Sequence, residues 1–307
     1  MPEIQILKEK IFNWTLFIVL SFIWGSSFVL MKEGMQVLSP YQVAALRILS
    51  AGVVLIPFAF RAIKQVPKNK LGLVALSGIL GSFIPAFLFC LAETKIDSSL
   101  AGILNALTPF FTILVGIAFF ELKAERKKII GIIIGFIGLI LLFTGNGHID
   151  FKNVSYSSFI FVATILYGLN VNMVGRHMHG IGSINIATLA FVFLIIPCLF
   201  ILYFTGYFSL PLGQKEYLIS TGASAILGIM GTAVASILFY MLIKRAGAVF
   251  SSMVTYGIPF VAVFWGLMLD EQITIWQIIS LSVILAGVYL ANANKNPFSI
   301  LRTKEKG

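Results

Sequence analysis

The sequence contains little charge for its length. Of its 307 residues, 11% are Asp, Glu, Lys or Arg and 59% are hydrophobic, and the mean hydropathy is +0.98. A soluble domain carries about 25% charged residues, so this chain has too little polar surface to face water on all sides. Its long apolar runs also differ from the short alternating segments of a transmembrane β-barrel. The composition therefore predicts an all-α polytopic membrane protein.

Reactive and metal-binding side chains are equally scarce. Both cysteines, Cys90 and Cys198, fall in apolar segments, where we expect them to pack rather than to form a disulfide or bind a metal. His148, His177 and His179 lie at loops or span ends. No G-x-x-x-x-G-K-[ST] sequence occurs, which excludes an ATP-driven motor within this chain. No carboxylate lies deep in an apolar segment, which leaves no buried proton relay. No deep nucleophile or acid–base pair is visible either, so we expect no enzyme activity. We also expect no cofactor and no metal site.

Ten apolar segments approach the ~20 residues that a membrane-spanning helix needs. We expect spans near residues 14–33, 41–60, 71–92, 98–120 and 128–145, and in the second half near 155–175, 184–204, 217–240, 247–268 and 273–291. Five spans return the chain on the opposite side of the membrane, so the second half must be inverted relative to the first. The sequence thus predicts ten transmembrane helices as two inverted five-helix repeats, residues 1–146 and 147–307.

An internal repeat supports this division. One pattern of proline, glycine and glutamate occurs twice, 150 residues apart, at Pro109, Gly116 and Glu121 and again at Pro259, Gly266 and Glu271. Over residues 78–121 against 228–271, nine of 44 positions are identical. The matching spacings favour a duplication over chance similarity between two apolar helices, and repeats of this kind are common in membrane transporters.

The distribution of basic residues predicts the orientation. With a cytoplasmic N-terminus, 17 lysines and arginines fall on the cytoplasmic side and four on the opposite side, as the positive-inside rule requires. The net charge of +10 is then explained by contact with anionic lipid, without nucleic acid. We expect a multi-pass protein of the cell membrane with both termini cytoplasmic, and the sequence leaves a homodimer open.

Several short motifs occur in an order that is typical of one transporter family. They are Trp24-Gly25-Ser26-Ser27-Phe28 in the first span, Arg47 after Pro40 in the second, and the repeated proline, glycine and glutamate pattern. With ten spans in two inverted halves, the chain resembles the drug/metabolite transporter superfamily, specifically its EamA family. The second half departs from the first, since Tyr167-Gly168 stands for Trp24-Gly25 and Ala190 for Arg47. The resemblance implies export of small metabolites, often amino acids, through a central cavity between the halves.

Arg47 is the only charged residue well inside a predicted span. A cation at mid-membrane costs about 2.5–3.5 kcal/mol on insertion scales, so its side chain should face the protein interior or water. It could be the counter-charge of a substrate carboxylate. Alternatively, it could be structural, either extending its charge toward the membrane surface or pairing with Glu33.

Two prolines are predicted to loosen helices beside the cavity. Pro109 and Pro259 have no amide hydrogen, so the carbonyls of Asn105 and Thr255, four residues earlier, lose their helical partners. A wet cavity would satisfy such carbonyls. By helical spacing, Asn105 shares a face with Thr108, and Thr255 and Tyr256 lie on the corresponding face of the second half. Packing between helices through small polar residues is the alternative.

Two further pairs suit a cavity wall for a partly apolar ligand. They are Trp24 with Ser27 on the first span, and Tyr167 with Asn170 on the sixth. The sequence therefore predicts a secondary transporter that exports small metabolites, amino acids or related amphiphiles, by rocking one half against the other. Its partners would be a small-molecule substrate and membrane lipid. A membrane enzyme acting on lipid, a channel and a scaffold without carrier activity are the alternatives.

The charge distribution generates a test of topology. Reporter fusions at Lys68 and Lys127 are expected to read as cytoplasmic, and fusions near Asp150 and Gly213 as external. A reversed reading at any two of these positions would contradict the inverted-repeat arrangement.

Overall fold

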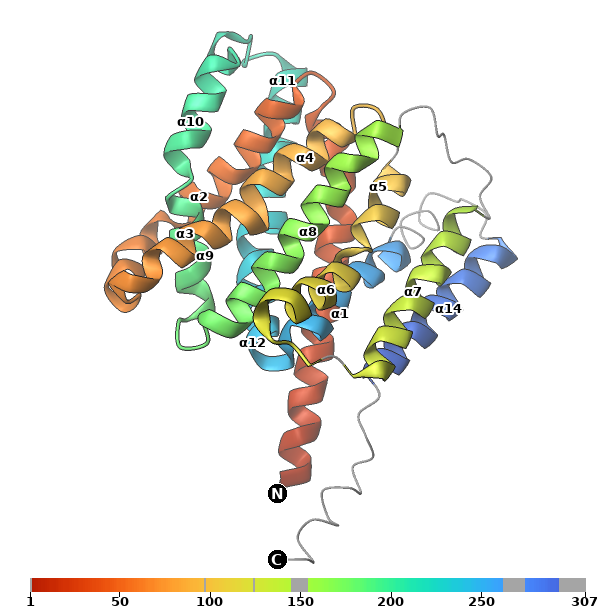
Figure 1. The fold of residues 1–307 in the computed structure, drawn as a ribbon. Helices are drawn as coiled ribbons and strands as arrows, with labels where there is room; N and C mark the ends of the chain where they lie inside the picture. The colour runs from red at the N-terminus through yellow and green to blue at the C-terminus, as the bar shows by residue number, and fades with distance from the viewer. Residues whose placement is uncertain (1, 97, 124, 145–153, 262–273, 293–307) are drawn as a thin grey trace, which may run out of the picture.

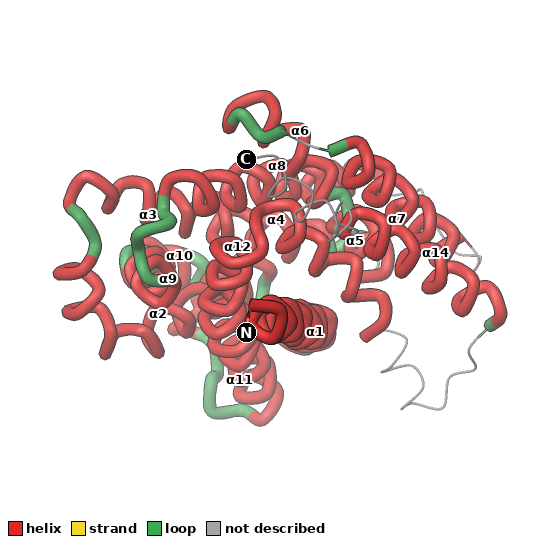
Figure 2. Tube along the Cα trace, turned by 90° about the horizontal axis from the view of Figure 1, so that it is seen from below, coloured by secondary structure: helices red, strands yellow, loops and turns green. Residues whose placement is uncertain are grey.

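The described part of the chain is a bundle of helices. The structure is a computed structural model, and it describes residues 2–96, 98–123, 125–144, 154–261 and 274–292. Every regular element within these ranges is a helix (Figures 1 and 2). This agrees with the predicted all-α membrane protein of ten spans in two inverted repeats.

The helices of the first half follow the predicted spans. They are α1 (Pro2–Gly34), α2 (Pro40–Gln65), η1 (Lys68–Lys70), α3 (Leu71–Gly78), η2 (Ile79–Phe83), α4 (Ile84–Ala92), α5 (Ser98–Asn105), α6 (Thr108–Phe120) and α7 (Arg126–Thr144). The third predicted span contains α3, η2 and α4, and the fourth contains α5 and α6.

The second half has the same order. Its helices are α8 (Val154–His177), α9 (Ser183–Val192), α10 (Ile195–Phe204), η4 (Tyr207–Ser209), α11 (Lys215–Gly228), η5 (Ile229–Val234), α12 (Ala235–Ser252), η6 (Met253–Gly257) and α14 (Ile275–Asn292). The ninth predicted span, 247–268, is described only as far as Val261. The boundary between the predicted repeats, at 146–147, lies outside the described residues.

The continuous helical stretches do not correspond one to one with the ten predicted spans, because one span is divided and two others are joined. Six continuous stretches of the described chain are long and apolar enough to cross a membrane, and one of them runs from Lys215 to Val261. That stretch covers two predicted spans, which meet at a turn where Gly247 has a φ of 85°. Only glycine adopts this conformation without steric cost, so Gly247 allows the chain to reverse within a residue or two.

The start of α2 is fixed by its own sequence. Ser39 caps the helix, because its hydroxyl accepts a hydrogen bond from the Gln42 amide at 3.3 Å, while the Gln42 side chain accepts from the Ser39 amide at 2.9 Å. Pro40 follows in the first turn, where its missing amide hydrogen costs nothing. The Gln42 side chain also donates to the Thr205 carbonyl at 2.9 Å, which ties α2 to the end of α10. Arg47 therefore occupies a defined position two turns into a capped helix.

Each half has a π-helical segment at the same place. These segments, η2 and η5, start 150 residues apart, the offset of the internal repeat. A π-helical turn inserts an extra residue into the helix and frequently marks a functional site. The nine sequence identities between the halves include a glycine within each segment, Gly81 and Gly231. The periodicity of the apolar residues did not predict either segment.

Close contacts at equivalent glycines interlock the two halves. A Cβ at Gly78 of α3 would lie 2.7 Å from the Ala190 carbonyl of α9, and a Cβ at Gly228 of α11 would collide with the Arg47 carbonyl of α2. Ala190 and Arg47 are the two positions that the repeat makes equivalent. The contact of α3 with α9 is thus repeated by the contact of α11 with α2. Each half packs into the other, and the halves are not separate lobes (Figure 2).

The last helix of each half, α7 and α14, pack side by side at one edge of the bundle (Figures 1 and 2). Gly131 and Gly135 of α7 lie against Gly287 of α14, where a Cβ would stand 2.6 Å from the Gly131 carbonyl. Small residues four positions apart allow such close approach of helices in membranes. The GxxxG spacing of Gly131 and Gly135 is the sequence signal for this contact.

This contact generates a stability prediction. Gly287→Ala should force α7 and α14 apart, because backbone atoms of α7 cannot give way, and should destabilise the protein by about 1–3 kcal/mol. Gly72→Ala in α3 is the matched control, since nothing lies within 4 Å of a Cβ there. Melting temperatures of the purified variants measure the difference. Equal melting temperatures for both variants would show that the pair does not depend on this glycine.

Candidate functional site

A central cavity lies between the two halves. It contains about 900 Å³ of empty space, including the part that is open to solvent, and its walls come from α1, α2, η2, α4, α5, α6, α8, η5, α12 and the η6 region. Both π-helical segments contribute to the wall, through Gly81 and Ser82 of η2 and through Gly231 and Thr232 of η5.

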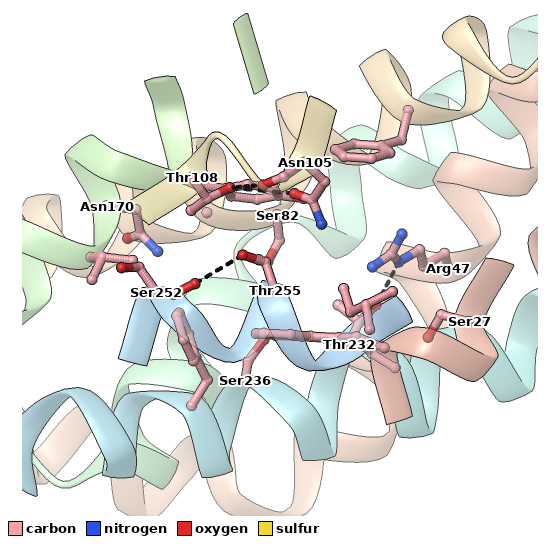
Figure 3. A pocket seen from close by; sticks show the side chains of 18 of the residues that line it. Ser27, Arg47, Ser82, Asn105, Thr108, Asn170, Thr232, Ser236, Ser252 and Thr255 are labelled. Carbon is pink, nitrogen blue, oxygen red and sulfur yellow. Dashed lines mark hydrogen bonds between the residues drawn. The ribbon is translucent and has the colours of Figure 1, made fainter. Parts of the chain in front are cut away.

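Most of the residues singled out from the sequence surround this cavity. Eight of the nine candidates line it, namely Trp24, Ser27, Arg47, Asn105, Thr108, Tyr167, Asn170 and Thr255. They come from five spans and both halves, and Figure 3 shows several of them directed toward the same space. Contact of these residues with a substrate stays a prediction.

Tyr256 is the ninth candidate, and the structure places it outside the cavity wall. Its side chain is fully buried, and its hydroxyl donates to the Ile132 carbonyl of α7 at 2.8 Å. The reason is the local geometry: residues 253–257 form a 3₁₀-helix, in which positions three apart align. Ser252 and Thr255 therefore face the cavity together, whereas Tyr256 turns toward α7.

Arg47 occupies the cavity wall without an acidic partner. Its Nε donates to the Thr232 hydroxyl of η5 at 2.7 Å, a contact between the two halves (Figure 3). Pairing with Glu33, one of the alternatives, does not occur, since Glu33 is exposed at the end of α1 and forms no ion pair with Arg47. Arg47 is the one charged residue in the described lining of the cavity.

The region before Pro109 differs in detail from the expectation. The span is interrupted between Asn105 and Thr108, and Pro109 lies in the first turn of the new helix α6. The Asn105 carbonyl, which Pro109 deprives of a helical partner, accepts a hydrogen bond from the Thr108 hydroxyl at 2.6 Å. The sequence predicted that the cavity would satisfy this carbonyl, but the Thr108 hydroxyl does so instead. Pro259 follows η6 in the equivalent place.

Other hydroxyl groups of the wall are also bonded to the backbone. The hydroxyls of Ser27 and Ser252 donate to the Ile23 and Val249 carbonyls, both at 2.8 Å, and Thr255 donates to Ser252 at 3.1 Å. A hydroxyl has one proton, so these oxygens present only lone pairs to a ligand. This part of the wall accepts hydrogen bonds rather than donating them.

Comparisons with known proteins identify the family. The sequence matches the EamA-like transporter family over residues 13–144 and again over residues 155–293. The chain belongs to the EamA-like transporter family. It is therefore a multi-pass membrane transporter, as the resemblance in the sequence implied.

Relatives of this EamA-like transporter carry transporter names. An "Uncharacterized transporter" of Archaeoglobus fulgidus is 24% identical over 286 residues, which cover 91% of this chain and 98% of that protein. A "Probable amino-acid metabolite efflux pump" of Salmonella typhimurium is 30% identical over 143 residues, 45% of this chain and 44% of that protein. A crystal structure matches with a TM-score of 0.68 and 14% identity, covering 96% of this chain and 99% of that one, and so shares the fold.

The cavity of this EamA-like transporter also has aromatic walls that follow the repeat. Phe89 and Phe239, 150 residues apart, both line it. Phe239 meets Trp24 edge-on with ring centroids 5.0 Å apart, and Phe89 lies 6.2 Å from Tyr167. Neither phenylalanine was among the residues predicted from the sequence to line the cavity, although both are identical positions of the repeat. Their identity at the 150-residue offset of the internal repeat is the sequence signal that could have identified them.

Trp24 connects the first span to the second half. Its indole Nε1 donates to the Gly231 carbonyl in η5 at 3.1 Å. A π-helical segment leaves backbone carbonyls without regular helical partners, and a membrane offers no water in exchange. The position of Trp24 in the cavity wall is thus set by the π-helical segment opposite it.

One ion pair of this transporter lies away from the cavity, at the end of α6. Arg176 of α8 donates to the Phe120 carbonyl and to the Glu121 carboxylate, the latter at 2.8 Å. The hydrogen bond and the charge of Arg176 lower the pKa of Glu121 below its ordinary value. Because both side chains are exposed, this pair contributes little to stability.

The position of Tyr256 generates a prediction. Tyr256→Phe removes its bond to α7 and should lower stability by about 0.5–1.5 kcal/mol without changing the KM of transport. Tyr289→Phe, at an exposed tyrosine of α14, is the control and should change neither quantity. Thermal unfolding and flux measurements on both variants test this. A raised KM with unchanged stability would return Tyr256 to the substrate site.

Proposed function

We propose that this protein is a secondary transporter that exports small metabolites, amino acids or related amphiphiles, through the central cavity by alternating access. The observation that carries the proposal is Arg47. It is a cation in the wall of a cavity between two halves, with a hydroxyl and no carboxylate as its described partner.

Arg47 is suited to bind a carboxylate of the substrate. Its Nε is held by Thr232, which leaves the two terminal nitrogens of the guanidinium for a ligand. These nitrogens form a planar fork that matches the two oxygens of a carboxylate. The low dielectric of the membrane interior strengthens such a pair and makes an unpaired cation costly.

The remaining walls suit an amphiphile. Trp24, Phe89, Tyr167 and Phe239 provide apolar surface, and the bonded hydroxyls provide acceptors for an ammonium or hydroxyl group. The name of the Salmonella typhimurium relative, an amino-acid metabolite efflux pump, supports the same substrate class.

Alternating access requires the wall helices to bend or to repack. The interruption between Asn105 and Thr108 and the two π-helical segments are places where regular helical hydrogen bonding is broken. We propose that the helices move at these places, while the close glycine contacts between the halves act as pivots.

The geometry favours transport over catalysis. An enzyme acting on lipid needs a nucleophile or an acid–base pair in its site. The described wall offers one charged residue, Arg47, and no carboxylate, and the hydroxyl protons of Thr108 and Ser252 are bonded to backbone carbonyls. A channel differs from a carrier in kinetics, because only a carrier shows saturation and counterflow.

Flux measurements in liposomes test the proposal. The purified protein should transport one or more of the common amino acids, with saturation and counterflow. Arg47→Ala should lower the flux at least ~10-fold, the loss expected for a hydrogen-bonded charge, and Arg47→Lys should recover little because an ammonium lacks the planar fork.

Arg61→Ala is the matched control, because Arg61 is an exposed arginine on the same helix. Its flux should equal that of the unaltered protein. Normal flux by Arg47→Lys would refute the bidentate contact. Loss of folding by Arg47→Ala would instead assign Arg47 a structural role.

A further inference from the structure

Asn105 presents its amide to the cavity in a fixed orientation. It lies at the end of α5, where the span is interrupted, and only 8% of its surface is exposed. The single proton of the Thr108 hydroxyl is shared between the Asn105 carbonyl at 2.6 Å and, in a longer branch, the side-chain oxygen Oδ1 of Asn105 at 3.4 Å. Because Oδ1 faces Thr108, the other branch of the carboxamide, the Nδ2 amide, turns away from Thr108.

The amide of Asn105 and the guanidinium of Arg47 face the same part of the cavity (Figure 3). Nδ2 makes no hydrogen bond to another residue in the described part of the chain, so its two protons are available. The Arg47 side chain is held from the other side by Thr232 at 2.7 Å. The same cavity is therefore lined by two donors, one charged and one neutral.

A carboxylate is the ligand that fits such a pair. Its two oxygens accept about four hydrogen bonds and donate none, and an arginine fork uses only part of this capacity. A primary amide can supply a further donor without adding charge. An ammonium group, in contrast, would be repelled by the positive charge of the Arg47 guanidinium.

We propose that Arg47 and Asn105 together bind one carboxylate of the substrate, and that Thr108 is a positioning residue that keeps the Asn105 amide directed at it. The inference rests on the proposed function in taking the cavity as the substrate site. The repeat supplies no second copy of this carboxylate site, because Ala190 and Thr255 occupy the positions equivalent to Arg47 and Asn105. The carboxylate therefore binds on the side of the first half only.

Two small probes separate the carboxylate from the rest of a ligand. Phenylacetate carries a carboxylate and an aromatic ring, and phenylacetamide has the same shape without the charge. We expect calorimetric titration of the purified protein to give a Kd for phenylacetate at least ~10-fold below that for phenylacetamide. Equal values for the two probes would overturn the proposal.

Variants then assign the roles. Asn105→Leu and Thr108→Val should each raise the Kd of phenylacetate about 10-fold and leave that of phenylacetamide unchanged. Thr108→Ser retains the hydroxyl and should restore most of the affinity. Thr112→Val is the matched control, since Thr112 lies one turn further on α6, is fully buried outside the cavity wall and donates in the same way to the Thr108 carbonyl at 2.8 Å.

Asn105→Asp keeps the shape of Asn105 if the leucine variant does not fold. It places a carboxylate in the same cavity wall as Arg47 and should abolish the preference for phenylacetate. Phenylacetate affinity equal to that of the unaltered protein in this variant would overturn the proposal, as would equal effects of Thr108→Val and Thr112→Val.

The two proposals fail separately. If liposomes show no amino-acid flux while phenylacetate is still preferred, the proposed function fails and the carboxylate site remains. If amino acids are transported but Asn105→Leu weakens both probes equally, Asn105 is only part of the wall and the carboxylate site alone fails.

Discussion

A polar group inside a membrane must find its partner within the protein, because hydrocarbon offers none. This constraint accounts for many of the contacts in the structure. The Trp24 indole satisfies a carbonyl of η5, the Tyr256 hydroxyl donates to α7, and Thr108 satisfies the carbonyl that Pro109 leaves unpaired. Asn172 similarly donates to Thr112 and Gly168, which joins α8 to α6. In the described residues, the cavity wall is one place where this pairing is incomplete, as at the side-chain oxygen of Asn170, and so a place where a ligand can complete it.

The spans and the central charge could be predicted from the sequence because both depend on transfer free energy. A run of ~20 apolar residues identifies a span, and one arginine within such a run must be buried or wet. Most of the selected side chains line the cavity for the same reason, since polar residues with helical spacing in an apolar span rarely face lipid. The hydrophobic pattern thus determines which face of a helix is turned inward.

The details that the sequence did not reveal concern departures from the α-helix. Tyr256 was assigned to the cavity on a spacing of 3.6 residues per turn, but residues 253–257 have about three. The π-helical segments and the Arg47–Thr232 contact likewise depend on local register and on packing between distant segments. Such features are decided by tertiary contacts that a single sequence does not display.

Arg47 and Ala190 occupy equivalent positions of the two halves, and this difference has a consequence for how such a protein is built. A symmetric assembly of two identical inverted subunits would bring two guanidinium groups to one cavity, and each would raise the electrostatic cost of the other. Joining the halves in one chain removes that requirement, since one copy of the position can become small while the other keeps its charge. The described cavity wall therefore carries its charge on the side of the first half, although the two halves of the scaffold follow the same plan.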